Sequence, residues 1–301
     1  MAEFTAYFNG EWVPLSEVKI DHKDRGFMVA DVVFDLARTF NGKSHRMKEH
    51  VDRLYRSLKA VRIDPGLSPE EMLDISEESI RRNEHLRPEV GDLSITQFVT
   101  RGPGRFAHSA GPPTVCVRVE EIDFGKYARF MKPGAPVVIT RTRSYPAESL
   151  DPKVKHYSRM NFNLAELEAG DVDPNAFPVL TDTDGNLTEG TGQNFFLVTG
   201  GVIRTPGRST VLRGVSKGVV FDLAHQLGIP IVEEDLQPYD VYTADEAFLS
   251  STYSCVLPVT TVDKRQVGNG KPGTITQQLL AAWSEAVGLD IVDQMVRFAR
   301  E

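Results

Sequence analysis

The chain has 301 residues, of which 41% are hydrophobic and 25% are charged, and its formal net charge is −8 at pH 7. This length exceeds the usual size of a single hydrophobic core, so we expect two domains. The composition is typical of an ordinary globular protein. Because the net charge is negative and no basic stripe is present, the sequence argues against a nucleic-acid partner.

The cellular location is inferred from the termini and the cysteines. Residues 1–12 lack both the basic segment and the continuous apolar segment of a signal peptide. No apolar stretch approaches the roughly 20 residues that a membrane helix requires. Cys116 and Cys255 lie far apart in apolar runs and are interpreted as buried, reduced thiols. We therefore expect a cytoplasmic protein that does not enter a membrane.

The first half of the chain alternates between strand and helix patterns. The turn at Asn9-Gly10 predicts a hairpin, and Ser68 followed by Pro69 is typical of a helix start. Apolar residues between 48 and 62 recur at helical spacing. The elements expected, in chain order, are a hairpin over 5–13, a strand over 29–39, a second hairpin turn at 41–42, helices over 48–62 and 68–82, and strands over 93–100 and 114–119.

The second half predicts a β-meander followed by helices. The elements expected are a strand over 136–143, a meander over 178–204, a helix over 215–227 that Gly228 ends, strands over 229–233 and 246–249, and a helix near 274–287. Strands and helices mix without a regular βαβ alternation, which indicates the α+β class. We predict a small α+β domain over 1–120, a linker over 121–134 and a large α+β domain over 135–301.

Two residues suggest the chemistry of the site. Lys155 precedes an Asn-rich helix start, and Glu189 lies in a Gly-rich hairpin beside Gly190 and Gly192. A lysine amine that binds an aldehyde covalently, with an acid for a ring nitrogen, is the pair that a pyridoxal 5′-phosphate (PLP) enzyme needs. Each could instead be an ordinary surface group. Lys153 is an alternative to Lys155, because an alternating strand directs both side chains to the same face.

A phosphate site is suggested by Arg53 and by a helix start. Arg53 shares a helix face with His50 and Ser57, and offers the donor fork that binds phosphate, although it could simply pair with Glu49. The helix that begins after residues 212–214 presents free N–H groups. Residues 250–253 follow a predicted strand and add hydroxyl groups.

Other common site types find no support in the sequence. The seven histidines show no metal-ligand spacing, and no Cys-x-x-Cys motif occurs. No Gly-x-Ser-x-Gly elbow indicates a serine hydrolase. The glycines at 190 and 192 are not part of a complete dinucleotide-binding fingerprint.

The ordered motifs of the chain resemble those of class IV aminotransferases, the fold-type IV PLP enzymes. The motifs are Asp24-Arg-Gly-Phe27, Glu49-His-Val-Asp-Arg-Leu54, Val99-Thr-Arg-Gly102, Lys155 through Ala169, Leu187-Thr-Glu-Gly-Thr-Gly-Gln-Asn194, Leu212-Arg-Gly-Val-Ser216, Asp245 through Ser250 and Leu257-Pro-Val-Thr260. The resemblance implies two α+β domains with PLP between them. It also implies a homodimer in which each subunit borders its partner's site.

The resemblance assigns roles by position. It implies that Lys155 holds PLP covalently, Glu189 binds the pyridine nitrogen, Arg53 binds the phosphate, Leu212 packs on the ring, and Val215, Ser216 and Thr252 complete the phosphate site. The family spacing to Glu168-Ala169 favours Lys155 over Lys153. Many branched-chain members have Tyr where this chain has Met160. Arg159, in a Lys-His-x-x-Arg pattern, is similar to aminodeoxychorismate lyases, and its contact with the cofactor oxygen is a hypothesis.

The substrate is predicted from three further segments. Branched-chain members carry Tyr-x-Arg where this chain has Ser94 and Thr96, which argues against an L-branched-chain substrate. The run around Phe34 is similar to (R)-selective amine transaminases. The loop with Arg105 and His108 resembles the carboxylate-binding loop of D-amino acid transaminases, although a solvated loop is the simpler interpretation. Residues assigned to substrate binding are Phe34, Ser94, Thr96, Arg105, His108 and Tyr253.

The reaction expected first is therefore ping-pong transamination between an (R)-amine or D-amino acid and a 2-keto acid. An L-branched-chain aminotransferase comes second, and a PLP lyase similar to aminodeoxychorismate lyase comes third. A non-catalytic binding module remains as a different class of protein.

Overall fold

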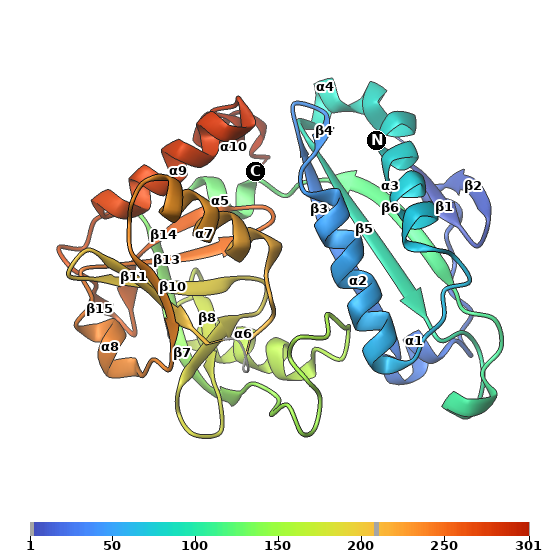
Figure 1. Cartoon of the computed structure of the whole chain (residues 1–301), viewed down its shortest axis with the longest axis horizontal. Helices are drawn as coiled ribbons and strands as arrows, with labels where there is room; N and C mark the ends of the chain where they lie inside the picture. Colours follow the sequence, from blue (N-terminus) through green and yellow to red (C-terminus); the bar gives the residue numbers. More distant parts are fainter. Residues whose placement is uncertain (1–2, 208–210, 301) are drawn as a thin grey trace. The chain divides into compact units, whose positions relative to one another are not determined.

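The computed structural model describes residues 3–207 and 211–300, which fall into two compact units (Figure 1). The first unit contains residues 1–122 and 154–158, and the second contains 123–153 and 159–301. The division differs from the predicted boundaries in two respects. Residues 123–134 are part of the second unit instead of a separate linker, and residues 154–158 return to the first unit after the chain has left it.

The first unit is built on one sheet with the strand order β2-β1-β6-β5-β3-β4. Its strands are β1 (Thr5–Phe8), β2 (Glu11–Pro14), β3 (Val32–Phe40), β4 (Lys43–Ser44), β5 (Leu93–Thr100) and β6 (Val115–Glu121). The predicted hairpin at Asn9-Gly10 is confirmed, since Phe8 pairs with Glu11 across that turn. Strand β3 begins later than predicted, because the short helix α1 (Arg25–Val29) takes up the start of the apolar run.

Helices α2 (Met47–Val61) and α3 (Pro69–Asn83) pack on one face of this sheet, as Figure 1 shows, and the short α4 (Arg87–Val90) follows them. The predicted start of α3 is confirmed: Ser68 Oγ accepts from the N–H of Glu71, whose side chain accepts from the N–H of Ser68. Val51, Leu54 and Leu58 place the apolar stripe of α2 in the core of the unit.

Two of the family motifs stabilise this unit. The carboxylate of Asp31 accepts from Nε of Arg101, at 2.7 Å, and from Nε of Arg25, at 2.9 Å. Arg101 also donates to the carbonyl groups of Val61 and Arg62, at the C-terminal end of α2. Burial alone would raise the pKa of Asp31, but these two arginines lower it below its ordinary value. The motif arginines thus hold the loop before β3 against the end of α2.

The returning segment, residues 154–158, pairs with the edge of β3. The N–H of Phe34 donates to the carbonyl of Lys155 at 3.0 Å, and the N–H of Tyr157 donates to the carbonyl of Val32 at 3.3 Å. Val33 and His156 form the bridge between these two bonds. The segment therefore forms an isolated antiparallel bridge that fixes the main chain of Lys155 beside β3.

The second unit is built on a larger sheet with the path β12-β11-β10-β13-β14-β7-β8-β9. Its strands are β7 (Ala135–Arg143), β8 (Phe177–Thr181), β9 (Leu187–Gly190), β10 (Asn194–Thr199), β11 (Val202–Pro206), β12 (Ile231–Glu234), β13 (Glu246–Ser251), β14 (Cys255–Val262) and β15 (Arg265–Gln266), which pairs with β14. Because β9 also pairs with β10, the strands from β10 round to β9 close into a ring.

Helices complete the second unit. They are α5 (Gly125–Ala128), α6 (Met160–Val172), α7 (Val215–Gln226), α8 (Pro238–Tyr242), α9 (Thr274–Val287) and α10 (Ile291–Phe298). Helix α7 packs against β13 and α9, and α6 packs against β7 and β8 (Figure 1). Cys255, in strand β14, and Cys116, in β6, are both buried. Within the described residues, no helix is both long and apolar enough to cross a membrane.

Candidate active site

The residues proposed from the sequence divide between the two units, and each group is described within its own unit. The first unit holds Phe34, Arg53, Ser94, Thr96, Arg105, His108 and Lys155. The second unit holds Arg159, Glu189, Leu212, Val215, Ser216, Thr252 and Tyr253.

Lys155 lies in the first unit between β3 and α2. Its N–H donates to Oγ of Ser57 at 3.1 Å, and its carbonyl accepts from Phe34. Its Nζ lies 4.6 Å from the centroid of the Phe34 ring, which in turn stacks on Tyr157 at 4.1 Å. Lys155 is half-buried, and its amine lies against an aromatic face. The main chain of the residue is held from both sides.

Arg53 lies in a buried polar cluster of the first unit. Its Nε and Nη2 donate to the two carboxylate oxygens of Asp35, at 2.8 and 2.7 Å. Nδ1 of His50 lies 2.7 Å from Oδ1 of Asp35. Because a carboxylate only accepts, Nδ1 carries the proton in this contact. Arg53 therefore pairs with Asp35, a partner that the sequence reasoning did not name.

The protonation of the cluster follows from burial and charge. Burial alone would raise the pKa of Asp35, but Arg53 and His50 lower it far below its ordinary value. Burial lowers the pKa of His50, and Arg53 and Lys155 lower it further, against the opposite effect of Asp35. The cluster therefore contains an ionised carboxylate, a charged guanidinium and a neutral imidazole.

The residues proposed for substrate binding on β3 and β5 share one face of the sheet. Thr96 lies opposite Leu36, and Ser94 lies opposite Arg38, in the antiparallel register of the two strands. Since side chains alternate along a strand, Phe34 projects to the same face as Leu36 and Arg38. Ser94 and Thr96 are both buried. The structure thus brings Phe34, Ser94 and Thr96 onto one face.

Arg38 was not singled out from the sequence. Its side chain is 1% exposed, and its guanidinium lies 4.0 Å from the centroid of the Phe40 ring. It places a positive charge on the face that carries Ser94. An arginine within a run that is apolar except for Asp35 and Thr39 was the signal that could have identified it.

Arg105 and His108 lie in an exposed loop of the first unit. His108 stacks on Phe106 with the ring centroids 5.6 Å apart, and the Arg105 guanidinium lies 5.4 Å from the same ring. The carbonyl of Arg105 accepts from Nη1 of Arg25 at 3.2 Å. Phe106 thus gathers the two basic side chains into one group at the loop surface.

Glu189 lies where the ring of strands in the second unit closes. It pairs in register with Asn194, and the residue is 7% exposed. Oε1 accepts from the N–H of Leu212 at 3.0 Å, and Oε2 lies 3.3 Å from Nδ2 of Asn194. The same Nδ2 donates to the carbonyl of Leu212 at 3.1 Å. Asn194 therefore fixes both the carboxylate and residue 212, a role that the sequence reasoning did not assign.

The start of α7 lies directly after this contact. Gly214 is the N-cap residue and has no side chain with which to cap the first N–H groups of the helix. Val215 is the first residue of the helix, and Ser216, the second, is buried. Thr252 and Tyr253 follow β13 and are partly buried. Burial raises the pKa of Tyr127, and the electrostatic effect of Tyr253 acts in the same direction.

Arg159 is the residue before α6. Its guanidinium lies 4.4 Å from the centroid of the Phe162 ring in the first turn of that helix. Met160 is exposed. The proposed contact between Arg159 and a cofactor oxygen stays a prediction.

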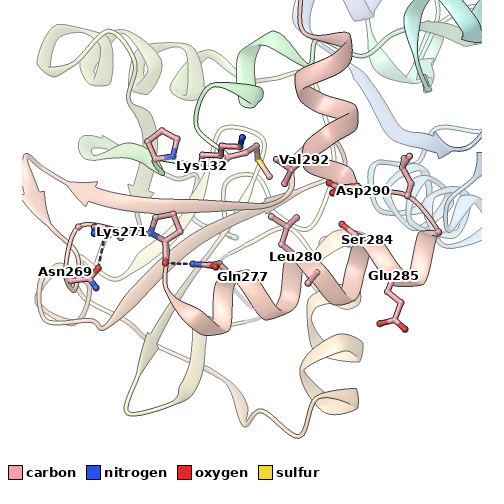
Figure 2. Close-up of a pocket in the computed structure, with 16 residues that line it drawn as sticks. Lys132, Asn269, Lys271, Gln277, Leu280, Ser284, Glu285, Asp290 and Val292 are labelled. Carbon is pink, nitrogen blue, oxygen red and sulfur yellow. Dashed lines mark hydrogen bonds between the residues drawn. The ribbon is translucent and has the colours of Figure 1, made fainter.

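A separate hollow occurs in the second unit (Figure 2). It has a volume of about 1390 Å³ and is lined by residues 131–133, by the loop 269–272 and by side chains of α9 and the start of α10. Lys132 and Lys271 line it together with Glu285 and Asp290, so its charges are mixed. The residues predicted for the active site are absent from its described lining. Across the described part of the chain, no cluster of His, Cys, Asp or Glu could hold a metal ion.

Comparisons with known proteins identify the family. The model for amino-transferase class IV matches residues 32–262. A putative branched-chain-amino-acid aminotransferase of Methanocaldococcus jannaschii is 36% identical over 280 residues, which cover 91% of this chain and 93% of that protein. A D-alanine aminotransferase of Staphylococcus aureus is 29% identical over 291 residues, which cover 91% of this chain and 94% of that protein.

Solved structures give the same result. The branched-chain amino acid aminotransferase of T.th., solved with pyridoxamine 5′-phosphate, is 27% identical, with a TM-score of 0.87 over 95% of both chains. The chain therefore belongs to the class IV aminotransferase family and has the α+β, fold-type IV architecture. The resemblance of its ordered motifs to that family is confirmed.

The contact between Gly214 and Asn194 generates a prediction. A Cβ atom at position 214 would overlap Oδ1 of Asn194, whose amide is held by Glu189 and Leu212. We expect Gly214→Ala to lower the free energy of unfolding by about 1–3 kcal/mol, as overpacked sites do. Urea denaturation measures this change.

Gly218→Ala is the matched control in the same helix, because a Cβ there meets open space. It is expected to leave stability unchanged or to raise it by up to about 1 kcal/mol, from the better helix propensity of alanine. Equal effects of the two substitutions would contradict the proposed steric role of Asn194.

Proposed function

We propose that this class IV aminotransferase moves an amino group between a D-amino acid or (R)-amine and a 2-keto acid by a ping-pong mechanism, with PLP as its cofactor. Two observations support the proposed D-amino acid or (R)-amine substrate. Phe34, Ser94 and Thr96 share one face of β3 and β5, and positions 94 and 96 lack the Tyr and Arg expected of branched-chain members.

The residues of the second unit fit the cofactor. The Glu189 carboxylate is buried and held by Leu212 and Asn194, which suits a group that binds a protonated ring nitrogen. The start of α7 offers N–H groups and the Ser216 hydroxyl to a phosphate, and Gly214 has no side chain to cap these N–H groups. Val215 and Thr252 are proposed to complete this phosphate site, and Leu212 to pack on the ring.

The residues of the first unit fit the same cofactor. Arg53 supplies the guanidinium charge that suits a phosphate, with its Nε and Nη2 already bonded to Asp35. Lys155 offers an amine on a main chain that is fixed by Ser57 and Phe34. When bound, PLP supplies an electron sink for the charge left at the substrate α-carbon. Lys155 is proposed to hold the cofactor covalently and, once released by the substrate amine, to move the proton at the α-carbon through its Nζ.

The basic residues of the first unit support a substrate that bears a carboxylate. Arg38 places a buried positive charge opposite Ser94, and Arg105 and His108 add an exposed basic group. These charges favour an amino acid over a simple amine. Tyr253 is proposed as a further substrate contact.

A second candidate is an L-branched-chain aminotransferase. It is supported by similarity to the putative branched-chain-amino-acid aminotransferase of Methanocaldococcus jannaschii, at 36% identity, and to the solved branched-chain enzyme, at 27%. A PLP lyase is a third candidate, supported by Arg159 in its Lys-His-x-x-Arg pattern. A cytoplasmic location stays a prediction.

The role of Lys155 is tested by substitution. We expect Lys155→Ala to lower turnover by at least about 100-fold, because the only proposed proton carrier at the α-carbon is lost. Borohydride reduction of the holoenzyme, followed by peptide mass spectrometry, is expected to find the cofactor fixed on residue 155. Lys153→Ala is the control, since Nζ of Lys153 pairs with Asp151 at 2.8 Å, and it is expected to retain activity. Cofactor fixed on Lys153 would refute the assignment.

The substrate is tested by half-reactions. The change in cofactor absorbance is followed with (R)-phenylethylamine, D-alanine, L-leucine and their mirror images. We expect the D or R form to react at least roughly tenfold faster than its mirror image, since the site binds the two transition states differently. A faster reaction of L-leucine than of D-alanine would favour the second candidate. If an amine and pyruvate yield no alanine, the lyase is favoured.

A homodimer is proposed from helix α6. Its small residues Ala165 and Ala169 face the sheet, whereas Met160, Leu164 and Leu167 are 67, 50 and 68% exposed along the opposite side. When two copies of α6 pack across a twofold axis perpendicular to the helix, they run antiparallel. Such packing brings the basic end of one helix, at Arg159, beside the acidic end of the other, at Asp171. A second copy of the chain therefore matches this apolar stripe in hydrophobicity and in charge.

Charge reversal of the stripe tests the dimer. We expect Leu164→Glu combined with Leu167→Glu to convert the protein from dimer to monomer in light scattering at micromolar concentration, because four carboxylates would face each other. Far-UV circular dichroism checks that the fold is retained. Tyr239→Glu is the control, since Tyr239 is 72% exposed on α8, outside the stripe. A wild-type monomer, or a double variant that stays dimeric, would disprove this interface.

A further inference from the structure

Asp35 is a buried carboxylate with no role in the reaction proposed above. It lies in the middle of β3, is fully buried, and projects toward α2 between Val33 and Ala37, both core residues. An ionised group in such a position is costly unless it is paired. Its side-chain partners are Arg53 and His50 of α2, and the N–H of Leu36 also donates to Oδ1, at 2.7 Å. The apolar face of β3 therefore carries one charged cluster.

We propose that Asp35, supported by His50, is a positioning residue that fixes the Arg53 guanidinium in the orientation needed to bind the phosphate group of the cofactor. The inference rests on the phosphate-binding role proposed for Arg53. It concerns how the site is built before the cofactor arrives.

The hydrogen-bond geometry carries the argument. Asp35 accepts from Nε and Nη2, at 2.8 and 2.7 Å, and thereby binds one edge of the planar guanidinium. Two parallel bonds fix both the position and the plane of the group. The Nη1 corner of the same plane is then directed away from Asp35. An arginine held in this way loses little further rotamer freedom when it binds an anion.

His50 orients the carboxylate in turn. Its Nδ1 lies 2.7 Å from Oδ1 of Asp35, the oxygen that also accepts from Nη2 of Arg53. The ring is 2% exposed, and its partner is fully buried. Nδ1 and Nη2 are 3.4 Å apart, but both donate to Asp35, so this distance is a contact and not a hydrogen bond. The order of support is therefore His50 to Asp35 to Arg53.

The negative charge of Asp35 has two opposite effects on phosphate binding. It repels the phosphate directly, and it holds in place the arginine that attracts the phosphate. Our proposal requires the second effect to dominate. The carboxylate also keeps the Arg53 charge compensated in the protein without cofactor, where a buried unpaired charge would be strongly destabilising.

The test compares two ligands that differ only in the phosphate group. The full chain is freed of cofactor by incubation with an amino donor and dialysis, and is then titrated with PLP and with pyridoxal by absorbance. The ratio of the two dissociation constants, pyridoxal over PLP, measures the contribution of the phosphate. We expect Asp35→Asn to reduce this ratio at least about tenfold, while the dissociation constant of pyridoxal stays within about threefold of wild type.

Asp92→Asn is the matched control. Asp92 is also a buried carboxylate of the first unit, and it accepts from Thr39 Oγ1, at 2.7 Å, and from the N–H groups of Asn41 and Gly42. Asp92→Asn is expected to lower the unfolding temperature but to leave the ratio of the pyridoxal and PLP dissociation constants unchanged. If Asp35→Asn fails to fold, His50→Ala is used. It removes one donor to Asp35 and leaves the Arg53 contact, so a several-fold reduction of the ratio is expected.

Each outcome decides the proposal. An unchanged ratio, or equal weakening of both ligands, would show that Asp35 has a structural role only. A larger ratio would show that repulsion dominates, and would overturn the proposal as well. If wild-type protein binds neither ligand, the proposed function fails instead, which separates the two conclusions.

Discussion

The pairing of residues 154–158 with the edge of β3 is the contact on which the candidate site of the first unit depends. It brings the main chain of Lys155 to Phe34 on one side and to Ser57 of α2 on the other. A lysine side chain has many rotamers, so an amine that must reach one carbon atom needs a fixed backbone. The hydrogen bonds to β3 provide that backbone. They also explain why a segment from the middle of the chain is part of the first unit.

In the second unit, the closure of the strands has a comparable effect. β9 meets β10 at the pair Glu189–Asn194, and both side chains also contact residue 212 at the approach to α7. One contact therefore links a carboxylate, an apolar side chain and a helix start. These are the features that a planar, phosphorylated ring would require. The glycine at 214 allows the loop to approach Asn194 this closely.

The proposed substrate preference depends on a few side chains and not on the scaffold. The scaffold is shared with relatives that carry two names, a putative branched-chain-amino-acid aminotransferase and D-alanine aminotransferases. Family membership thus leaves the substrate undecided, because function depends on the site and not on the fold. In this chain, Ser94 and Thr96 leave the face of β3 and β5 with small polar groups, and Arg38 supplies the buried charge on the neighbouring strand.

The sequence by itself determined the local elements and the family. Helix α3 could be predicted because Ser68 and Pro69 mark its start, and the ordered motifs, those around Lys155 and Glu189 among them, indicated the family. Caps, turns and periodicity act over a few residues, so they are readable along the chain. Only the tertiary structure decided that Lys155 binds Ser57, 98 positions away, and that Asp35 pairs with Arg53 across β3 and α2. Such contacts depend on strand register and on which element covers which face, and no local pattern encodes either of them.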